Sequence, residues 1–163
     1  IATESTTRAG AYDRAIRRLR PDGKVNSCAC SLFVGLAEEG WAEGDVADAV
    51  ARRYLAPLFE DGAERPDTLV LGCTHFPLLE PAIRRAIGPG AAIVDSADTT
   101  AEAVAEILAG KGLLAPSGLR PPTTFLATDA PERFARVAGH FLGDPLPVDR
   151  VELVELQAVP EPA

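Results

Sequence analysis

The chain has no methionine, and several other residue types are scarce: two lysines, two histidines, one tryptophan and three cysteines among 163 residues. No apolar stretch approaches the roughly 20 residues that a membrane span needs. No cationic start followed by an apolar run predicts a signal peptide. Three cysteines at short spacing do not make a disulfide framework. We therefore expect a protein of the reducing cytoplasm with no membrane partner.

Positive charge is also in short supply. The formal net charge of −8 argues against a nucleic-acid partner, because phosphate binding needs a basic surface. The remaining composition, 47% hydrophobic and 25% charged residues, is typical of a globular protein. The length suits one domain, or one domain and part of another.

Strand and helix patterns alternate along the chain, which predicts an α/β fold with a mainly parallel sheet flanked by helices. The apolar run Thr68–Leu71 is typical of a strand buried on both faces of such a sheet. Further strands are predicted at Ile1–Thr3, Lys24–Ser27, Ala92–Val94, Thr123–Ala127 and Val148–Leu153. Helices are predicted at Asp45–Phe59, with Val46, Val50, Tyr54 and Leu58 on one face, at Leu78–Ile87 and at Pro131–Leu142.

Three further elements rest on local signals. Thr6 or Thr7 is a candidate cap for a helix that ends at Leu19. Thr99 and Glu102 have the spacing of a capping box, which predicts a helix to Leu108. Residues 31–39 are predicted to form either a loop or a helical turn.

The most informative segment follows the Thr68–Leu71 strand and reads Gly72-Cys73-Thr74-His75. Open α/β sheets build their sites at the carboxyl ends of their strands. A thiol there, near a helix amino terminus and an imidazole, is suited to take or return a proton as a thiolate. Thr74 adds a hydroxyl and a backbone N–H for substrate oxygens. We predict that Cys73 carries proton transfer.

Structural explanations for these residues are also open. A free cysteine often only fills space in a core, and His75 alone would be a hydrogen-bonded structural histidine. We interpret Cys28 and Cys30 as packing residues rather than as a second catalytic thiol. A zinc site built from Cys28, Cys30, Cys73 and His75 is conceivable, but their spacing lacks a Cys-x-x-Cys knuckle, so no metal is expected.

Several segments together resemble the glutamate racemases. Leu71–Leu79 is similar to the family's second catalytic-cysteine motif, which usually carries Tyr where Phe76 stands. Related aspartate racemases usually carry Glu where His75 stands. Similarity extends over nearly the whole chain, through the segments Thr6–Tyr12, Ala29–Gly40, Asp95–Ser96, Thr128–Phe134 and Val151–Leu153.

The resemblance implies an enzyme that interconverts L- and D-glutamate for peptidoglycan without a cofactor, using two cysteines in a cleft between two α/β domains. It implies that Cys73, His75 and Glu38 are catalytic and that Thr74 and His75 bind substrate. Residues 1–95 would form the second domain, and residues 96–163 the carboxyl-terminal part of a discontinuous first domain. The local pattern departs from the family at Ser31 and Gly35, near Glu38.

The family's first catalytic-cysteine motif and its Asp-Ser-Gly loop are not found in this sequence. We therefore expect the chain to be the carboxyl-terminal portion of a longer racemase and nearly inactive alone. A homodimer is a further expectation, because exposed strand edges favour association. Two alternatives stay open: an aspartate/hydantoin-type racemase or isomerase acting on another small acid, and a truncated binding module without catalysis.

Overall fold

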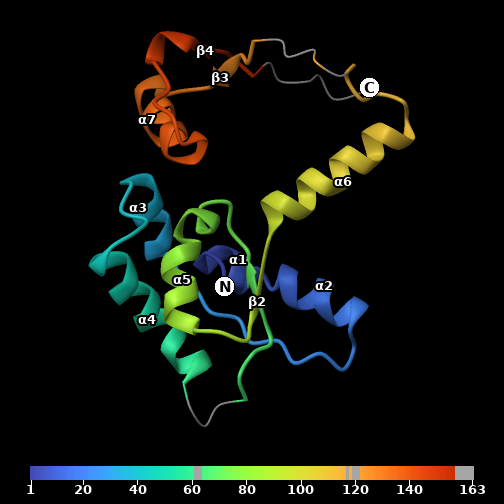
Figure 1. The fold of residues 1–163 in the computed structure, drawn as a ribbon, viewed down its shortest axis with the longest axis vertical. Coiled ribbons are helices and arrows are strands. Elements are labelled where there is room, and N and C mark those ends of the chain that lie inside the picture. The colour runs from blue at the N-terminus through green and yellow to red at the C-terminus, as the bar shows by residue number, and fades with distance from the viewer. Residues whose placement is uncertain (61–63, 117, 119–121, 157–163) are drawn as a thin grey trace, which may run out of the picture. The chain divides into compact units, whose positions relative to one another are not determined.

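The computed structural model describes residues 1–60, 64–116, 118 and 122–156 (Figure 1). The chain forms two compact units, Ile1–Leu114 and Ala115–Ala163. Helices and parallel strands alternate in both units, so the predicted α/β class is confirmed. The division at residues 95 and 96 drawn from the family resemblance stays a prediction.

The first unit holds most of the regular structure. Its helices are α1 (Glu4–Ala9), α2 (Ala11–Leu19), α3 (Leu32–Glu38), α4 (Asp45–Phe59), α5 (Glu80–Ile87) and α6 (Ser96–Gly110), with the 3-10 helix η1 (Phe76–Leu79) directly before α5. Its strands are β1 (Thr68–Leu71) and β2 (Ala92–Asp95). The predicted Leu78–Ile87 helix therefore starts earlier, as a 3-10 turn, because Pro77 and Pro81 lack the N–H groups of a continuous α-helix.

The sheet of the first unit is parallel. β1 pairs with β2 from Thr68↔Ala92 to Leu71↔Asp95. On the other side of β1, the amide of Gly72 donates to the carbonyl of Ile1 at 2.8 Å. Ala2 in turn forms a parallel bridge with Ala29. The predicted strand at Ile1–Thr3 is thus present as the short segment between β1 and Ala29.

The predicted strand at Lys24–Ser27 does not form. Within the described part of the chain these residues have no ladder partner, and the bridge to Ala2 is made two residues later, at Ala29. The side chain of Lys24 instead forms an exposed ion pair with Glu64. A strand needs a neighbouring backbone, and none of the described residues lies in register with this segment.

The core lies on one face of β1. Leu69 and Leu71 are buried, whereas Thr68 is exposed and Val70 is half-buried, so the strand alternates and is not buried on both faces. The large side chains without solvent contact include Phe33, Leu55, Phe76, Leu79 and Ile83, which come from α3, α4, η1 and α5. The core therefore supports the segment that follows β1.

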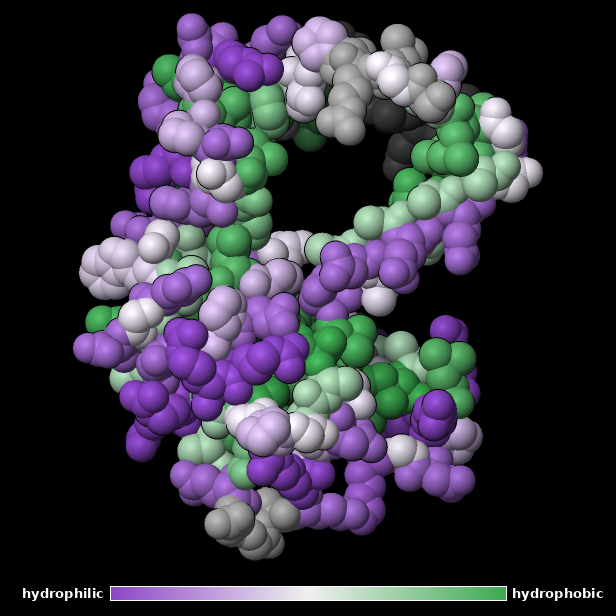
Figure 2. All heavy atoms as spheres, in the orientation of Figure 1, coloured by the Kyte–Doolittle hydropathy of each residue, from purple (hydrophilic) through white to green (hydrophobic). Residues whose placement is uncertain are grey.

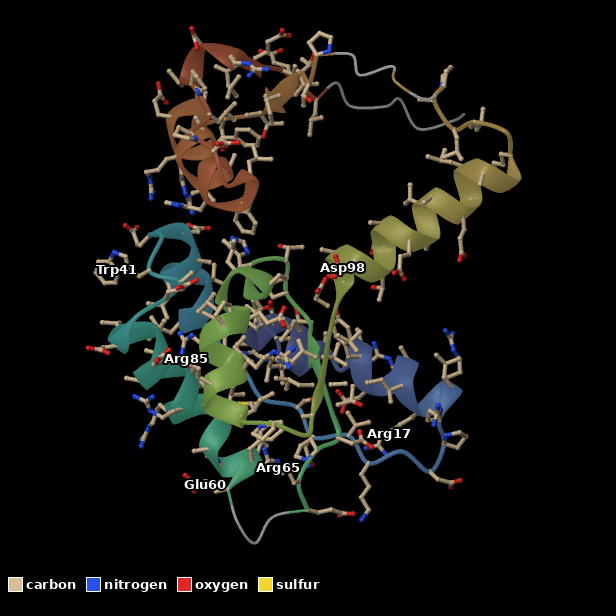
Figure 3. The ribbon with its side chains drawn as sticks, in the orientation of Figure 1. Arg17, Trp41, Glu60, Arg65, Arg85 and Asp98 are labelled. Atoms are coloured by element: carbon tan, nitrogen blue, oxygen red, sulfur yellow. The ribbon has the colours of Figure 1, made fainter. Side chains whose placement is uncertain are left out.

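Helix α4 has the predicted bounds but a different buried face. Ala47, Ala51, Leu55 and Phe59 are its buried residues, while Val46 is 53% exposed. Alanine side chains let α4 and α5 approach closely, and that contact decides which face is buried. Across it, Arg85 of α5 donates to both carboxylate oxygens of Asp48 at 2.7 to 3.1 Å; Figure 3 shows Arg85 at the boundary of the two helices.

Two helix starts differ from the prediction. Gly10, with φ of 61°, separates α1 from α2, so the helix predicted from Thr6 or Thr7 to Leu19 is two helices, and Thr3 precedes the first. Helix α6 begins at Ser96, because the carboxylate of Asp95 accepts from the amides of Ala97 and Asp98 at 2.7 and 3.0 Å. The predicted capping box at Thr99 lies inside that helix.

Helix α6 is amphipathic and open to solvent. None of its residues, all of which the structure describes, is buried, and Val104 and Ile107 are about half exposed. Figure 2 shows its apolar and polar faces as parallel green and purple strips. Nowhere among the described residues is a helix both long and apolar enough to cross a bilayer.

The second unit is small. It contains β3 (Phe125–Ala127), α7 (Pro131–Leu142), the 3-10 helix η2 (Val148–Arg150) and β4 (Val151–Leu153). β3 and β4 pair in parallel, and Ala127, Ala135 and Val151 form its buried core. The helix Pro131–Leu142 is confirmed at both ends, and the predicted strand at Val148–Leu153 is shortened by the 3-10 turn.

Candidate functional site

The candidate site begins at the carboxyl end of β1, where Gly72 allows a close approach of neighbouring chains. A Cβ at Gly72 would lie 2.8 Å from Tyr12 Cε2, 3.0 Å from the Ile1 carbonyl oxygen and 3.2 Å from Ala2 Cβ. Any larger residue would push away the adjacent strand. Gly72 thus fixes where the chain leaves the sheet, one residue before Cys73.

Cys73 is half-buried and lies in the turn between β1 and η1. The amide of Phe76 donates to the carbonyl of Cys73 at 3.1 Å, which closes this turn. The side chain packs against the edge of the core but keeps solvent contact. Partial exposure is what a group that exchanges protons with a bound substrate requires.

The other two predicted catalytic residues form a line of contacts that starts at this thiol. Cys73 Sγ is 3.8 Å from His75 Nδ1, and His75 Nε2 is 3.4 Å from Glu38 Oε1. The side chains of His75 and Glu38 are 24% and 23% exposed. A carboxylate beside Nε2 favours a proton on that nitrogen, which leaves Nδ1 able to accept a proton from the thiol.

Thr74, predicted to bind substrate, is exposed at the tip of the turn. Thr3 was not singled out by sequence reasoning. It follows the short segment that pairs with β1, so it lies at the same sheet edge as Cys73. Its hydroxyl shares hydrogen bonds with those of Ser5 and Thr6 at 3.2 and 3.0 Å. A hydroxyl directly after a short apolar strand was the signal that could have found it.

Cys28 and Cys30 form a separate thiol pair with their Sγ atoms 3.9 Å apart. Cys30 has no solvent contact, and burial, together with the neighbouring Cys28, raises the pKa of its thiol to about 12. Its partners are the sulfur and the carbonyl of Cys28. In the described part of the chain, no three His, Cys, Asp or Glu side chains are grouped to hold a metal ion.

A cavity of about 1090 Å³ also lies in the first unit. It is lined by α2, by the segments on either side of it and by the residues leading into β1, and it reaches Gly72 and Cys28. Neither Cys73 nor His75 lines it. The arrangement of acid–base groups, rather than this cavity, therefore defines the candidate site.

Comparison with known proteins places the chain in a family. The model of a family described as Asp/Glu/Hydantoin racemase matches residues 1–104. A curated glutamate racemase of Geobacter metallireducens is 49% identical over 146 residues, which make up 90% of this chain and 53% of that protein. Other curated glutamate racemases are matched over a similar share, so this chain spans little more than half of their length.

Solved structures give the same picture. A glutamate racemase isoform of Bacillus anthracis matches with a TM-score of 0.79 and 32% identity, covering 95% of this chain and 56% of that one. The glutamate racemase of Francisella tularensis, solved in complex with D-glutamate, matches with a TM-score of 0.78 and 27% identity over 94% of this chain and 56% of that one. The chain belongs to the Asp/Glu/Hydantoin racemase family.

Proposed function

We propose that this chain forms the part of a glutamate racemase that carries one of its two acid–base groups. The observation that supports the proposal most is the line of side chains from Cys73 through His75 to Glu38, with successive contacts of 3.8 and 3.4 Å. Such a line serves a thiol that must lose and regain a proton. The curated relatives, named glutamate racemase, suggest glutamate as the substrate.

The chemistry requires two groups on opposite faces of Cα. In one direction the thiolate of Cys73 takes the α-proton: the Cα–H bond breaks, an S–H bond forms, and the electron pair stays on Cα, delocalised into the adjacent carboxylate. A second acid on the other face then donates a proton to Cα with inversion. In the other direction the thiol of Cys73 is the donor. No cofactor takes part in these steps.

His75 and Glu38 return the thiol to its starting state. His75 Nδ1 accepts the thiol proton, and the carboxylate of Glu38 stabilises the resulting imidazolium. The exposed Thr74 and the hydroxyl of Thr3 lie at the same sheet edge and offer hydrogen bonds to substrate oxygens. Glutamate needs such donors because it carries two carboxylates.

The second acid–base group comes from outside the residues described. We interpret the free thiols of Cys28 and Cys30 as packing residues, whose sulfur atoms contact each other and main-chain oxygens at 3.8–3.9 Å. We place residues 1–95 in the second α/β domain, which carries Cys73, and residues 96–163 in the carboxyl-terminal part of a discontinuous first domain. The active cleft would be formed by the complete enzyme. The further parts of this proposal are a cytoplasmic location, D-glutamate supply for peptidoglycan, and a homodimer.

The test uses the full-length protein that contains these residues. It should exchange the α-proton of glutamate for deuterium in D2O without added cofactor. Cys73→Ala should lower racemisation by at least about 10²-fold, the lower range for loss of a general acid–base group. Cys28→Ala removes a thiol away from the proposed proton path and should leave racemisation near the parent rate. Normal racemisation by Cys73→Ala would reject the proposal.

A second candidate is an aspartate- or hydantoin-type racemase or isomerase, because the matching family model covers these activities too. His75 argues against this second candidate, because the corresponding motif of the aspartate racemases usually carries Glu at the position of His75. Incubating the full-length protein with glutamate, aspartate and hydantoins, and following circular dichroism, separates the two. A preference for aspartate or a hydantoin would replace glutamate in the proposal.

A further inference from the structure

Three aromatic rings from three elements contact one another next to the candidate site. Phe33 of α3 packs edge-on against Phe76 of η1, with ring centroids 5.3 Å apart and an interplanar angle of 89°. Phe33 also packs against Tyr54 of α4, with ring centroids 5.3 Å apart and an interplanar angle of 79°. Phe33 and Phe76 have no solvent contact. Phe33 is thus held between the two other elements.

This contact joins the two segments that supply the partners of Cys73. Phe33 lies five residues before Glu38 on the seven-residue helix α3, and Phe76 directly follows His75. The Phe33–Phe76 contact therefore joins the same two elements whose side chains approach each other at 3.4 Å, between Glu38 Oε1 and His75 Nε2.

The start of helix α3 is held by the backbone and by Tyr54: the amide of Phe33 donates to the carbonyl of Cys30 at 3.1 Å. Its N-cap residue, Ser31, makes no side-chain capping bond. The amide of Leu32 donates instead to the Tyr54 hydroxyl at 3.3 Å, so α4 supports α3 through the same tyrosine that packs on Phe33. A seven-residue helix is not stable by itself, so the position of α3 depends on its tertiary contacts.

We infer that Phe33 is a positioning residue, which holds the Glu38 carboxylate within reach of His75 and so supports proton return from Cys73. This inference rests on the proposed function for its catalytic meaning. Replacement of the ring by a smaller side chain leaves space between α3 and η1. A shift of about 1 Å takes a 3.4 Å contact outside the range in which hydrogen bonds act.

The test observes the imidazole directly. The chain has two histidines, so ¹⁵N spectra of the 163-residue protein contain His75 and, as an internal reference, His140. At a fixed alkaline pH we expect His75 of the parent to be almost wholly the Nε2–H tautomer, with a slowly exchanging Nε2 proton. Glu38→Gln should change both signals. Phe33→Leu should change them in the same direction, with a several-fold drop in the alkylation rate of Cys73.

The matched control is Ile87→Val. Ile87 is a buried core residue at the end of α5 farthest from η1. This variant therefore loses core packing while the rings of Phe33, Tyr54 and Phe76 are retained. It should lower the melting temperature while His75 and Cys73 behave as in the parent. Phe76→Leu removes the same ring contact from the other side, and serves if Phe33→Leu does not fold.

Parent-like His75 signals in Phe33→Leu and Phe76→Leu would overturn the inference, and so would a Glu38→Gln variant that leaves His75 unchanged. The measurement needs no substrate, so it fails or succeeds independently of racemisation. Full activity of Cys73→Ala in the complete enzyme would reject the proposed function while leaving this result in place.

Discussion

The same substitution, glycine to alanine, should have opposite effects on stability at two positions of the first unit. At Gly72 the new Cβ would lie 2.8 Å from the Tyr12 ring and 3.0 Å from the Ile1 carbonyl oxygen. That oxygen already accepts the Gly72 amide at 2.8 Å, so the neighbouring strand cannot withdraw without weakening this bond. At Gly35, inside α3, the alanine methyl group would have no heavy atom within 4 Å other than those of its chain neighbours and the backbone of its own helix.

Overpacking of this kind destabilises a core by about 1–3 kcal/mol. Alanine in place of glycine inside a helix stabilises by about 0.5–1 kcal/mol, because the unfolded chain loses freedom. For a chain of this size, 1 kcal/mol shifts the melting temperature by about 2–4 °C. Gly72→Ala should therefore melt roughly 2–12 °C lower than the parent and Gly35→Ala about 1–4 °C higher.

Thermal unfolding followed by circular dichroism at 222 nm measures both effects, with the wavelength chosen for the helical signal of α4 and α5. Gly72→Ala should also change the reactivity of the adjacent Cys73 thiol, whereas Gly35→Ala should not. An unchanged or raised melting temperature in Gly72→Ala would refute the close approach of Tyr12 and Ile1 to the end of β1.

Two further predictions concern titratable groups. The paired hydrogen bonds from Arg85 hold the pKa of the Asp48 carboxyl below its usual value. The pair therefore stabilises the fold above about pH 4, and this stabilisation is lost as pH falls through the lowered pKa. Asp48→Asn should thus lower stability near neutrality and converge with the parent in acid-range urea titrations; parallel curves would contradict the pairing. Burial raises the pKa of the Cys30 thiol to about 12, so iodoacetamide at mildly alkaline pH should label Cys73 before Cys30, as peptide mass mapping would show. Early labelling of Cys30 in the folded protein would contradict its burial.

The sequence is a good guide where a pattern is local. It predicts the strand Thr68–Leu71 and the helix Asp45–Phe59 with their bounds, because the residue types that favour each element lie within the segment itself. The line Cys73–His75–Glu38 is reached through resemblance, since Glu38 lies 37 residues before His75 and no spacing rule connects them. The sequence therefore predicts the members of that line of contacts and not its geometry.

Features that depend on neighbouring elements escape sequence reasoning. The helical period predicts that Tyr54 lies on the buried face of α4. In the structure the face with Ala51 and Leu55 is buried instead, because α4 packs closely on α5. The Tyr54 hydroxyl accepts a hydrogen bond from the Leu32 amide of α3. Likewise Asp95 starts α6 in place of Thr99, because a carboxylate at the end of β2 is already at hand for the first amides. Such choices follow from tertiary contacts that a single sequence does not display.

The place of Ile1 and Ala2 between β1 and Ala29 bears on the order in which the protein folds. The bond between the Ile1 carbonyl and Gly72 spans some 70 residues of chain. At about 5–20 residues per second of synthesis, the first strand waits roughly 4–14 s for its second neighbour to emerge from the ribosome. The sheet is therefore completed late, and during that interval the Ile1–Ala2 segment can pair only with the backbone around Ala29, while its edge toward β1 stays open.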